Sequence, residues 1–521
     1  MSSRFFAGLL VLLVSGFCFA LCTTPLASMD LWWHLRTGAE IVRTGELPRT
    51  DWYTYTDSSR PWIDLHWGFQ VLVHSLYQLG GTDLLILAKA ALTTLAVLLV
   101  WRGAGRGVGF ATGALVIALV AVVVSGQAIV RPKMLTLVAL ALCLLICKRA
   151  DQRQRALLAL IPLQILWTNV QGLFVLGPIV ATCWLVHRFA DRLVTSPAER
   201  NPSLLGSARF DIGVVCAVWL ACLVNPYGLD GALFPLELWK KFSVDQELYS
   251  IVLAFQRPID FIGENGSLRG YMIFQAGLFA IGLISFLPNL RRAKLQIFHA
   301  LVFTAFSVLA WKAIRNADLF AIAAGFVVLG NFASFGRAPV QPLEQQSSLG
   351  SLGGVLVLLG LFLALFTGKL FELAGDGRVL GLGERENWYM HGPVEFASQP
   401  SMPAGAFVRH NGQAAVYIHA TGPGRKVFLD GRLEVATKQT LARFHEISRR
   451  MAAGERAFED MIRMPNGKLP AVLLDSLYSR EEIDGMLGLP ERWRLVYQDK
   501  SGVVFLDEAT AAALGHPDLF Q

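Results

Sequence analysis

The segment "MSSRFFAGLLVLLVSGFCFALCTT" (residues 1–24) decides the class of fold, because an apolar run at 5–22 follows directly on Arg4. A basic residue before an apolar core is also typical of a cleaved signal peptide. The run is long for a signal core, however, and no A-x-A-like cleavage site follows it. We therefore expect an uncleaved first membrane-spanning helix.

The same pattern recurs along the chain and predicts a polytopic membrane protein. Of the 521 residues, 54% are hydrophobic and only 16% are charged, whereas a soluble protein carries roughly a quarter charged residues. About eleven apolar runs are predicted to span a membrane, near residues 5–22, 83–101, 108–125, 134–147, 156–169, 173–187, 211–224, 270–288, 296–311, 317–334 and 350–371. The fold class expected is a mainly α membrane bundle.

The charges and cysteines narrow the function classes. The net charge of +7 comes from short clusters between apolar runs, and no nucleic-acid-binding motif is present. The seven cysteines all lie in or beside apolar runs, so neither a disulfide framework nor a metal site is indicated. No His/Asp spacing decides for or against a divalent metal.

The basic clusters also predict the orientation of the chain. They fall on alternate loops and, by the positive-inside rule, mark the cytoplasmic side together with the N-terminus. The soluble tail then lies outside, in the periplasm or beyond the cell. The clusters are Arg102, Arg106, Lys148, Arg149, Arg153, Arg155, Arg188, Arg192, Arg291, Arg292, Lys294 and Arg337.

Two domains are predicted. Residues 1–371 form a transmembrane domain with outer loops at 23–82 and 225–268, and residues 372–521 form a small extracytoplasmic α/β domain. Amphipathic helices at the membrane surface are expected at 30–42 and 61–80. In the tail we expect a helix over 437–463 and strands at 415–420, 426–430 and 471–475, with a hairpin of 493–499 and 503–507.

Polar residues at the ends of apolar runs mark candidate sites, since ionisable groups there are costly. All fall on the predicted outer face: Asp30, Arg131, Lys133, Asn169, Gln171, Asn225, Lys312, Arg315 and Asn316. Each has a plain alternative. Asp30 fits a helix N-cap, Arg131 a snorkelling anchor, Asn225 a helix stop, and Trp32 and Trp33 an interfacial belt. The forked guanidinium of arginine suits a lipid phosphate.

A family resemblance adds to this interpretation. "DLWWHLRTGAEIVRTGELPRTD" (30–51), "RPKM" (131–134), "WTNVQG" (167–172), "NPYG" (225–228), "IRN" (314–316) and "VFLDGRLEV" (427–435) resemble motifs of an uncharacterised group of bacterial membrane proteins. These look like members of the GT-C glycosyltransferase superfamily. The resemblance covers nearly the whole chain. It departs at Gln171, where a histidine is expected, and at "QAAVYIH" (413–419).

The resemblance implies an inner-membrane enzyme. Such enzymes move a sugar from a polyprenyl-phosphate donor to a glycan, lipid or protein acceptor at the outer face. By this resemblance Asp30 is the general base, with Asp51 as a second acid and Asp64 behind it. Arg131 and Arg315 clamp the lipid phosphate. Further substrate-binding candidates are His34, His66, Lys133, Asn169, Asn225 and Asn316.

Two other functions stay open from the sequence. A transporter or flippase for lipid-linked sugars would place charges near mid-bilayer and show an inverted repeat. A non-catalytic scaffold in envelope polysaccharide assembly would keep the fold without the chemistry. In the tail, Asp430, Arg432 and Glu434 alternate as on one strand face, which fits a binding stripe or an exposed, ion-paired strand edge.

Overall fold

A computed structural model describes residues 3–104, 107–194, 203–244, 256–265, 270–291, 296–335, 348–375, 377–516 and 519. The chain forms two compact units. The first contains Met1–Pro25 and Asp83–Leu382, and the second contains Leu26–Thr82 and Gly383–Gln521. The outer loop that we expected in the transmembrane domain is thus part of the same unit as the C-terminal tail.

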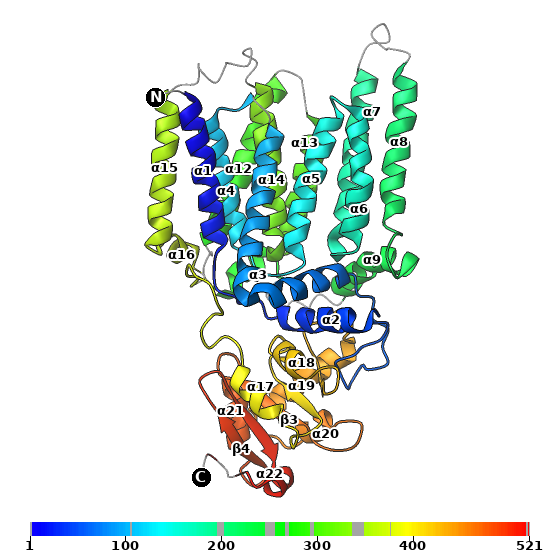
Figure 1. The fold of residues 1–521 in the computed structure, drawn as a ribbon, viewed down its shortest axis with the longest axis vertical. Helices are drawn as coiled ribbons and strands as arrows, with labels where there is room; N and C mark the ends of the chain where they lie inside the picture. The colour runs from blue at the N-terminus through cyan, green and yellow to red at the C-terminus, as the bar shows by residue number, and fades with distance from the viewer. Residues whose placement is uncertain are drawn as a thin grey trace. The chain divides into compact units, whose positions relative to one another are not determined.

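The first unit is helical, and a helix lies on each predicted apolar run. Its elements are α1 (Ser3–Cys22), the second half of α3 (Trp67–Ala104), α4 (Phe110–Ser125), α5 (Lys133–Ala150), α6 (Leu160–Thr168), α7 (Leu176–Val194), α8 (Ser203–Ala221), α9 (Gly228–Val244), α11 (Pro258–Asn265), α12 (Gly270–Arg291), α13 (Ile297–Lys312), α14 (Ala317–Phe335), α15 (Ser348–Phe366) and α16 (Lys369–Ala374). Short 3₁₀ turns precede α6, α7 and α14, at Gln154–Ala159, Gly172–Val175 and Ile314–Asn316. Figure 1 shows the long helices running side by side.

Within the described residues, five helical segments are long and apolar enough to cross a membrane: Phe5–Cys22, Trp67–Gly103, Gly172–Leu193, Gly270–Pro288 and Ile314–Ser334. Three further apolar helices are shorter, at Phe110–Ser125, Ile297–Lys312 and Gly350–Phe366. These segments confirm the expectation of a mainly helical bundle with helices that could cross a membrane.

Helix α14 forms the centre of the bundle. It packs against α4, α5, α12 and α13. In the segment Ile314–Ser334, 83% of the most apolar stretch is buried inside the protein. A Cβ atom placed on Gly325 would lie 2.6 Å from Cγ2 of Val120 in α4. Because this glycine carries no side chain, the two helices can approach closely, as small residues allow in membrane bundles.

The second unit combines helices with a small mixed sheet. The helices are α2 (Leu31–Thr44), the first half of α3, α17 (His391–Ala397), α18 (Ala414–Thr421), α19 (Lys438–Ala452), α20 (Phe458–Ile462), α21 (Arg480–Leu487) and α22 (Glu508–Leu514). The strands are β1 (Gly405–Val408), β2 (Lys426–Val427), β3 (Ala471–Asp475), β4 (Trp493–Gln498) and β5 (Gly502–Asp507). Their order is β2-β1-β3-β5-β4. β1 pairs in parallel with β2 and β3, and the other pairs are antiparallel.

Most of the local predictions for this unit agree with the structure. Helix α2, strand β3 and the β4–β5 hairpin form where expected, and the predicted 437–463 helix divides into α19 and α20 near Gly454, whose φ is +67°. The predicted strand at 415–420 is wrong, because those residues form α18. A short, fully buried apolar run does not distinguish strand from helix by its periodicity.

The predicted helix at 61–80 begins six residues later, at Trp67, and its C-terminal break is confirmed. Gly80 and Gly81 have non-helical backbone angles inside α3, with φ +60° and ψ −153° at Gly81. These glycines divide the part of α3 that belongs to the second unit from the part that belongs to the bundle.

The outer loop joins the sheet of the tail as an additional edge segment. Thr54 forms a parallel bridge with Val427 of β2. The Val427 N–H donates to the Tyr53 carbonyl at 2.9 Å, and the Tyr55 N–H donates to the Val427 carbonyl at 3.0 Å. The Thr56 hydroxyl donates to the Phe428 carbonyl at 2.6 Å. These hydrogen bonds explain why residues 26–82 and the tail form one unit.

Candidate functional site

The candidate residues from the sequence divide between the two units. Asp30, His34, Asp51 and His66 belong to the unit that carries the sheet. The helical unit contains the others: Arg131, Lys133, Asn169, Asn225, Arg315 and Asn316.

Asp30 occupies the N-cap position of α2, as the plain alternative predicted, but its side chain makes no capping hydrogen bond. Instead, the carboxylate lies against a turn of the tail. A Cβ atom on Gly431 would be only 2.7 Å from Oδ1 of Asp30. Only a residue without a side chain leaves room for the carboxylate at this point. The "DGR" turn at 430–432 therefore forms one wall of the Asp30 site.

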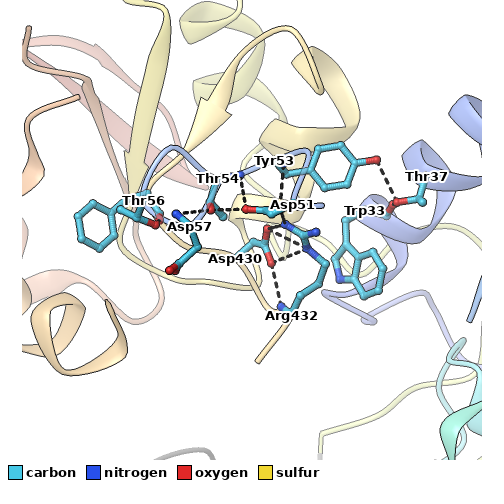
Figure 2. Close-up of polar contacts among 10 residues, drawn as sticks. Trp33, Thr37, Asp51, Tyr53, Thr54, Thr56, Asp57, Asp430 and Arg432 are labelled. Carbon is cyan, nitrogen blue, oxygen red and sulfur yellow. Dashed lines mark hydrogen bonds and ion pairs between the residues drawn. The ribbon is translucent and has the colours of Figure 1, made fainter. Parts of the chain in front are cut away.

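Asp51 is buried in an ionic network with the same turn (Figure 2). Its Oδ1 lies 2.6 Å from Nη2 of Arg432, and the same nitrogen lies 2.6 Å from Oδ2 of Asp430. The Tyr53 and Thr54 N–H groups donate to Asp51 at 3.0 and 3.1 Å, and the Thr54 hydroxyl also donates to it. This geometry gives Asp51 a structural task, since its oxygens are engaged inside the protein.

The network corrects the interpretation of residues 430–434 as a strand face. Strand β2 ends at Val427, so these residues form a turn. Asp430 and Arg432 are 2% and 1% exposed, which excludes both an accessible binding stripe and an exposed ion pair. The Arg432 guanidinium also lies over the rings of Trp62 and Tyr53, at 4.3 and 4.8 Å from their centroids. The alternation of charges indicated the local pair of Asp430 and Arg432, but the second partner of Arg432, Asp51, lies in a distant part of the sequence.

Burial and the guanidinium act in opposite directions on the acids around Arg432. Burial alone would raise the pKa of Asp51, but Arg432 and the Thr54 and Tyr53 hydrogen bonds hold it below its usual value. Burial raises the pKa of Asp430 in spite of Arg432. Burial also raises the pKa of Asp64 and of Glu434 to about 7, against the weaker pull of Arg432 and local hydrogen bonds. The positive charge of Arg432 thus acts to lower the pKa of all four carboxyl groups, against the effect of burial.

The two tryptophans of "WWHL" are buried, at 2% and 4% exposure, so neither a lipid belt nor an open stacking platform describes them. The Trp32 ring packs edge-on against Tyr389 and His391, at 5.3 and 5.1 Å between centroids. Helix α2, which carries both tryptophans, packs against α18 of the same unit.

His34 and His66 do come together within this unit. Their ring centroids are 5.7 Å apart, and His34 also packs against Trp33 and Phe69. His34 is buried, while His66 is partly exposed. The Asp64 Oδ1 accepts the backbone N–H of His66 at 3.0 Å, and Nδ1 of the His66 ring lies 3.9 Å from the same oxygen. Both imidazoles therefore lie in the Leu26–Thr82 part of the second unit, and the His66 ring lies beside Asp64.

In the helical unit, Lys133 connects the two segments that carry the candidate phosphate clamps. Its Nζ donates to the Arg315 carbonyl at 2.5 Å and lies 2.9 Å from Oδ2 of Asp318. The charges of both Arg131 and Arg315 also act on this ammonium group. Lys133 thus links the two segments that carry the arginines, and Asp318 offsets part of the positive charge there.

A small pocket opens at this point. Its polar lining residues are Arg131, Lys133, Asp318, Thr93 of α3 and Gln127 before α5, and its apolar ones are Ala128, Ile129, Met134 and Leu137. Arg315 is not among the residues that line it. The concentration of cationic groups at the ends of apolar helices suits an anionic headgroup. Asp318 and Thr93 were not among the sequence candidates. Asp318 stands three residues after Arg315, so "RNAD" held a signal that a search for isolated arginines overlooks.

The amide candidates in the helical unit hold backbone turns. Nδ2 of Asn169 donates to the carbonyls of Ile165 and Val224, which joins the end of α6 to the segment before α9. Asn225 closes its own turn by donating to the Cys222 and Gly228 carbonyls. Nδ2 of Asn316 donates to the Leu309 carbonyl at 2.9 Å. These contacts support the helix-stop alternative for Asn225 and explain the amides without a ligand.

Over the described ranges, no group of three His, Cys, Asp or Glu side chains is arranged to hold a metal ion.

The chain resembles solved structures of an archaeal enzyme in fold. The apo Archaeoglobus fulgidus oligosaccharyltransferase matches with a TM-score of 0.56 and 13% identity, over 96% of this chain and 74% of that one. Oligosaccharyltransferase AglB of the same organism, in complex with an inhibitory peptide and a dolichol phosphate, gives 0.58 and 13%, over 97% and 74%. The sequence matches no protein-family model and no curated protein. The similarity shows that this chain has the fold of these oligosaccharyltransferase structures.

Proposed function

We propose that this protein is a membrane glycosyltransferase that moves a sugar from a polyprenyl-phosphate donor to an acceptor at the outer face of a bacterial inner membrane. The observation that carries this proposal is the fold similarity to oligosaccharyltransferase structures over nearly the whole chain. The placement of Asp30 supports it, because its carboxylate is positioned by the tail and takes no part in capping its helix.

In the proposed reaction, an acceptor hydroxyl attacks the anomeric carbon of the donor sugar. Asp30 takes the hydroxyl proton as the new bond forms, and the bond between that carbon and the phosphate oxygen breaks. The lipid phosphate leaves with the electron pair of that bond. A general base of this kind typically contributes roughly 10²–10⁴-fold to the rate.

Arg131 and Arg315 receive the negative charge that develops on the leaving phosphate. Fixed cationic groups stabilise such charge without reorganising during the reaction. Lys133 supports them through the Arg315 carbonyl, and Asp318 keeps the Lys133 ammonium in place. The carboxylate of Asp51 is held by Arg432 and by backbone N–H groups, so its role in this proposal is structural.

The test is sugar transfer by the purified full chain in lipid nanodiscs, with polyprenyl-phosphate sugars as donors. Asp30→Asn should lower kcat by roughly 10²-fold or more and leave donor binding and thermal stability unchanged. Arg131→Gln and Arg315→Gln should weaken donor binding instead. Full activity of the Asp30→Asn variant would exclude Asp30 as the base. Lack of donor hydrolysis and transfer by the wild type would favour a non-catalytic scaffold.

A further inference from the structure

The tail pairs with the chain segment that leads into α2, and both belong to the second unit. The Leu26 N–H donates to the Gly383 carbonyl at 2.8 Å, and the Arg385 N–H donates to the Leu26 carbonyl at 3.0 Å. One residue further on, the Ala27 carbonyl accepts the indole N–H of Trp388 at 3.0 Å. The tail therefore fixes the path of the chain directly before α2.

The third contact of this series reaches the turn that carries Asp30. The Tyr389 hydroxyl donates to the Ser28 carbonyl at 3.1 Å. The same carbonyl accepts the Leu31 N–H at 3.4 Å. That second bond closes a turn at 28–31, with Met29 and Asp30 at its two central positions. Tyr389 thus holds the carbonyl on which this turn closes.

Tyr389 is itself held firmly inside the protein. Its side chain is buried, and its ring packs edge-on against Trp32 at 5.3 Å between centroids. The side chain of Gln413, which is 1% exposed, binds the backbone on both sides of it. Its Nε2 donates to the Trp388 carbonyl at 2.6 Å, and its Oε1 accepts the Met390 N–H at 3.1 Å. Gln413 is the first residue of "QAAVYIH", the segment that departs from the family pattern.

The turn sets the place of the Asp30 carboxylate because the helix that follows does not. Asp30 makes no capping hydrogen bond to α2. On one side, its Oδ1 meets the position that a Cβ atom on Gly431 would occupy, at 2.7 Å. The residue is partly exposed, so its carboxylate can be reached from outside. A shift of the turn would therefore move the carboxylate relative to the Gly431 wall.

We propose that Tyr389 is a positioning residue for Asp30, because its hydroxyl holds the Ser28 carbonyl and so fixes the turn from which the carboxylate meets the acceptor. This inference rests on the proposed role of Asp30 as the base. A general base acts only within hydrogen-bond reach of the proton that it takes. A misplacement of about 1 Å can lower the rate on the order of 10²-fold. The tail thus completes the site that the outer loop begins.

The kinetic test uses Tyr389→Phe, which removes the hydroxyl and keeps the ring against Trp32. We expect kcat to fall about tenfold and the donor KM to stay unchanged, since the arginines proposed for the donor phosphate are untouched. The control is Tyr55→Phe in the same unit. It removes the same kind of bond, from a tyrosine hydroxyl to the Ile462 carbonyl at 3.0 Å, and kcat should stay within about twofold. An equal loss of kcat in both variants would overturn the proposal.

A double variant shows whether Tyr389 acts through Asp30. In the Asp30→Asn background the base is already lost, so Tyr389→Phe should change the residual kcat by less than about twofold. General destabilisation would instead multiply the two losses. A further tenfold loss in the double variant would contradict the positioning role.

Hydrogen exchange of the turn does not depend on catalysis. The Leu31 N–H donates to the Ser28 carbonyl, and the His34 N–H donates to the Asp30 carbonyl at 3.3 Å. In Tyr389→Phe both amides should exchange about fivefold faster or more, since the turn loses one of its hydrogen bonds. Tyr55→Phe should leave both exchange rates unchanged.

The measurements separate the two possible failures. Unchanged exchange of the Leu31 and His34 amides in Tyr389→Phe overturns the role of Tyr389, even when the enzyme transfers sugar. Faster exchange in a protein whose wild type transfers no sugar supports the hold of Tyr389 on the Asp30 turn and refutes the proposed function.

Discussion

Replacing Arg432 by leucine tests the ionic network that joins the outer loop to the tail. The substitution removes the partner of two buried carboxylates, Asp51 and Asp430, each 2.6 Å from Nη2. Removing one partner of a buried pair costs about 3–5 kcal/mol, and the lost ring contacts with Trp62 and Tyr53 add about 0.5–2 kcal/mol. This is a large share of the ~5–15 kcal/mol that stabilises a typical domain.

Hydrogen exchange followed by mass spectrometry suits this prediction, because it reports local opening in a protein with more than one unit. The amides of Tyr55 and Val427, which bond across the loop and β2, should lose about 3 kcal/mol of protection or more. A triple variant that also carries Asp51→Asn and Asp430→Asn should recover at least half of the loss, since no buried charge is then left unpaired. Unchanged protection in Arg432→Leu would refute the argument.

The pH dependence of this variant has a definite sign. Without Arg432, burial raises the folded-state pKa of Asp51 and Asp430 above the unfolded value of roughly 3.9. Such groups destabilise the fold when ionised, so the cost is present at neutral pH and disappears as the pH falls and they become protonated. The difference between wild type and variant should therefore narrow from pH 7 toward pH 4. A difference that widens on acidification would contradict the assignment of charges.

Three further outcomes are expected. Gly431→Ala should reduce kcat about tenfold or more without unfolding, because its Cβ would lie 2.7 Å from Oδ1 of Asp30 and displace a group that must be accurately placed. The control is Gly424→Ala, whose Cβ would meet the Thr421 carbonyl oxygen at 3.5 Å, and equal rates of the two variants would count against this wall of the site. Asp64→Asn should stabilise the fold at pH 8, because burial raises the Asp64 pKa to about 7 and the ionised form then costs on the order of 2–4 kcal/mol. This gain in stability should vanish near pH 4, and thermal unfolding at both pH values measures it. Lys133→Met should weaken donor binding about tenfold, since it frees the Arg315 carbonyl and leaves Asp318 uncompensated. The added change Asp318→Asn should restore part of the affinity, and titration with a polyprenyl phosphate measures the affinity of both variants.

Local patterns of the sequence predict much of the secondary structure. The apolar runs predict the helices, because a segment surrounded by lipid must satisfy its backbone hydrogen bonds internally. The Lys500-Ser501-Gly502 turn predicts the β4–β5 hairpin, and the periodicity of "DLWWHLRTGAEIV" predicts α2. The failure at 415–420 has a physical cause. A run buried on every side has no polar face, and thus no period by which helix and strand differ.

The candidate residues required more than local pattern. Asp30 and the basic pair Arg131 and Arg315 were found from the cost of polar groups at helix ends. The residues that these side chains contact could not be found in this way. Arg432 meets Asp51 across 381 positions of sequence. Gly431 of the tail lies against Asp30, although some 400 residues of sequence separate the two.

The sequence by itself therefore determined a helical membrane protein with a mixed α/β tail and an acidic residue after the first apolar run. These features depend on composition and on periods of a few residues. The tertiary structure decided that the outer loop pairs with β2, that Asp51 is tied to a buried arginine, and that Asp30 lies against the Gly431 turn. Contacts of this kind depend on where distant segments meet, and no local period of the sequence records that.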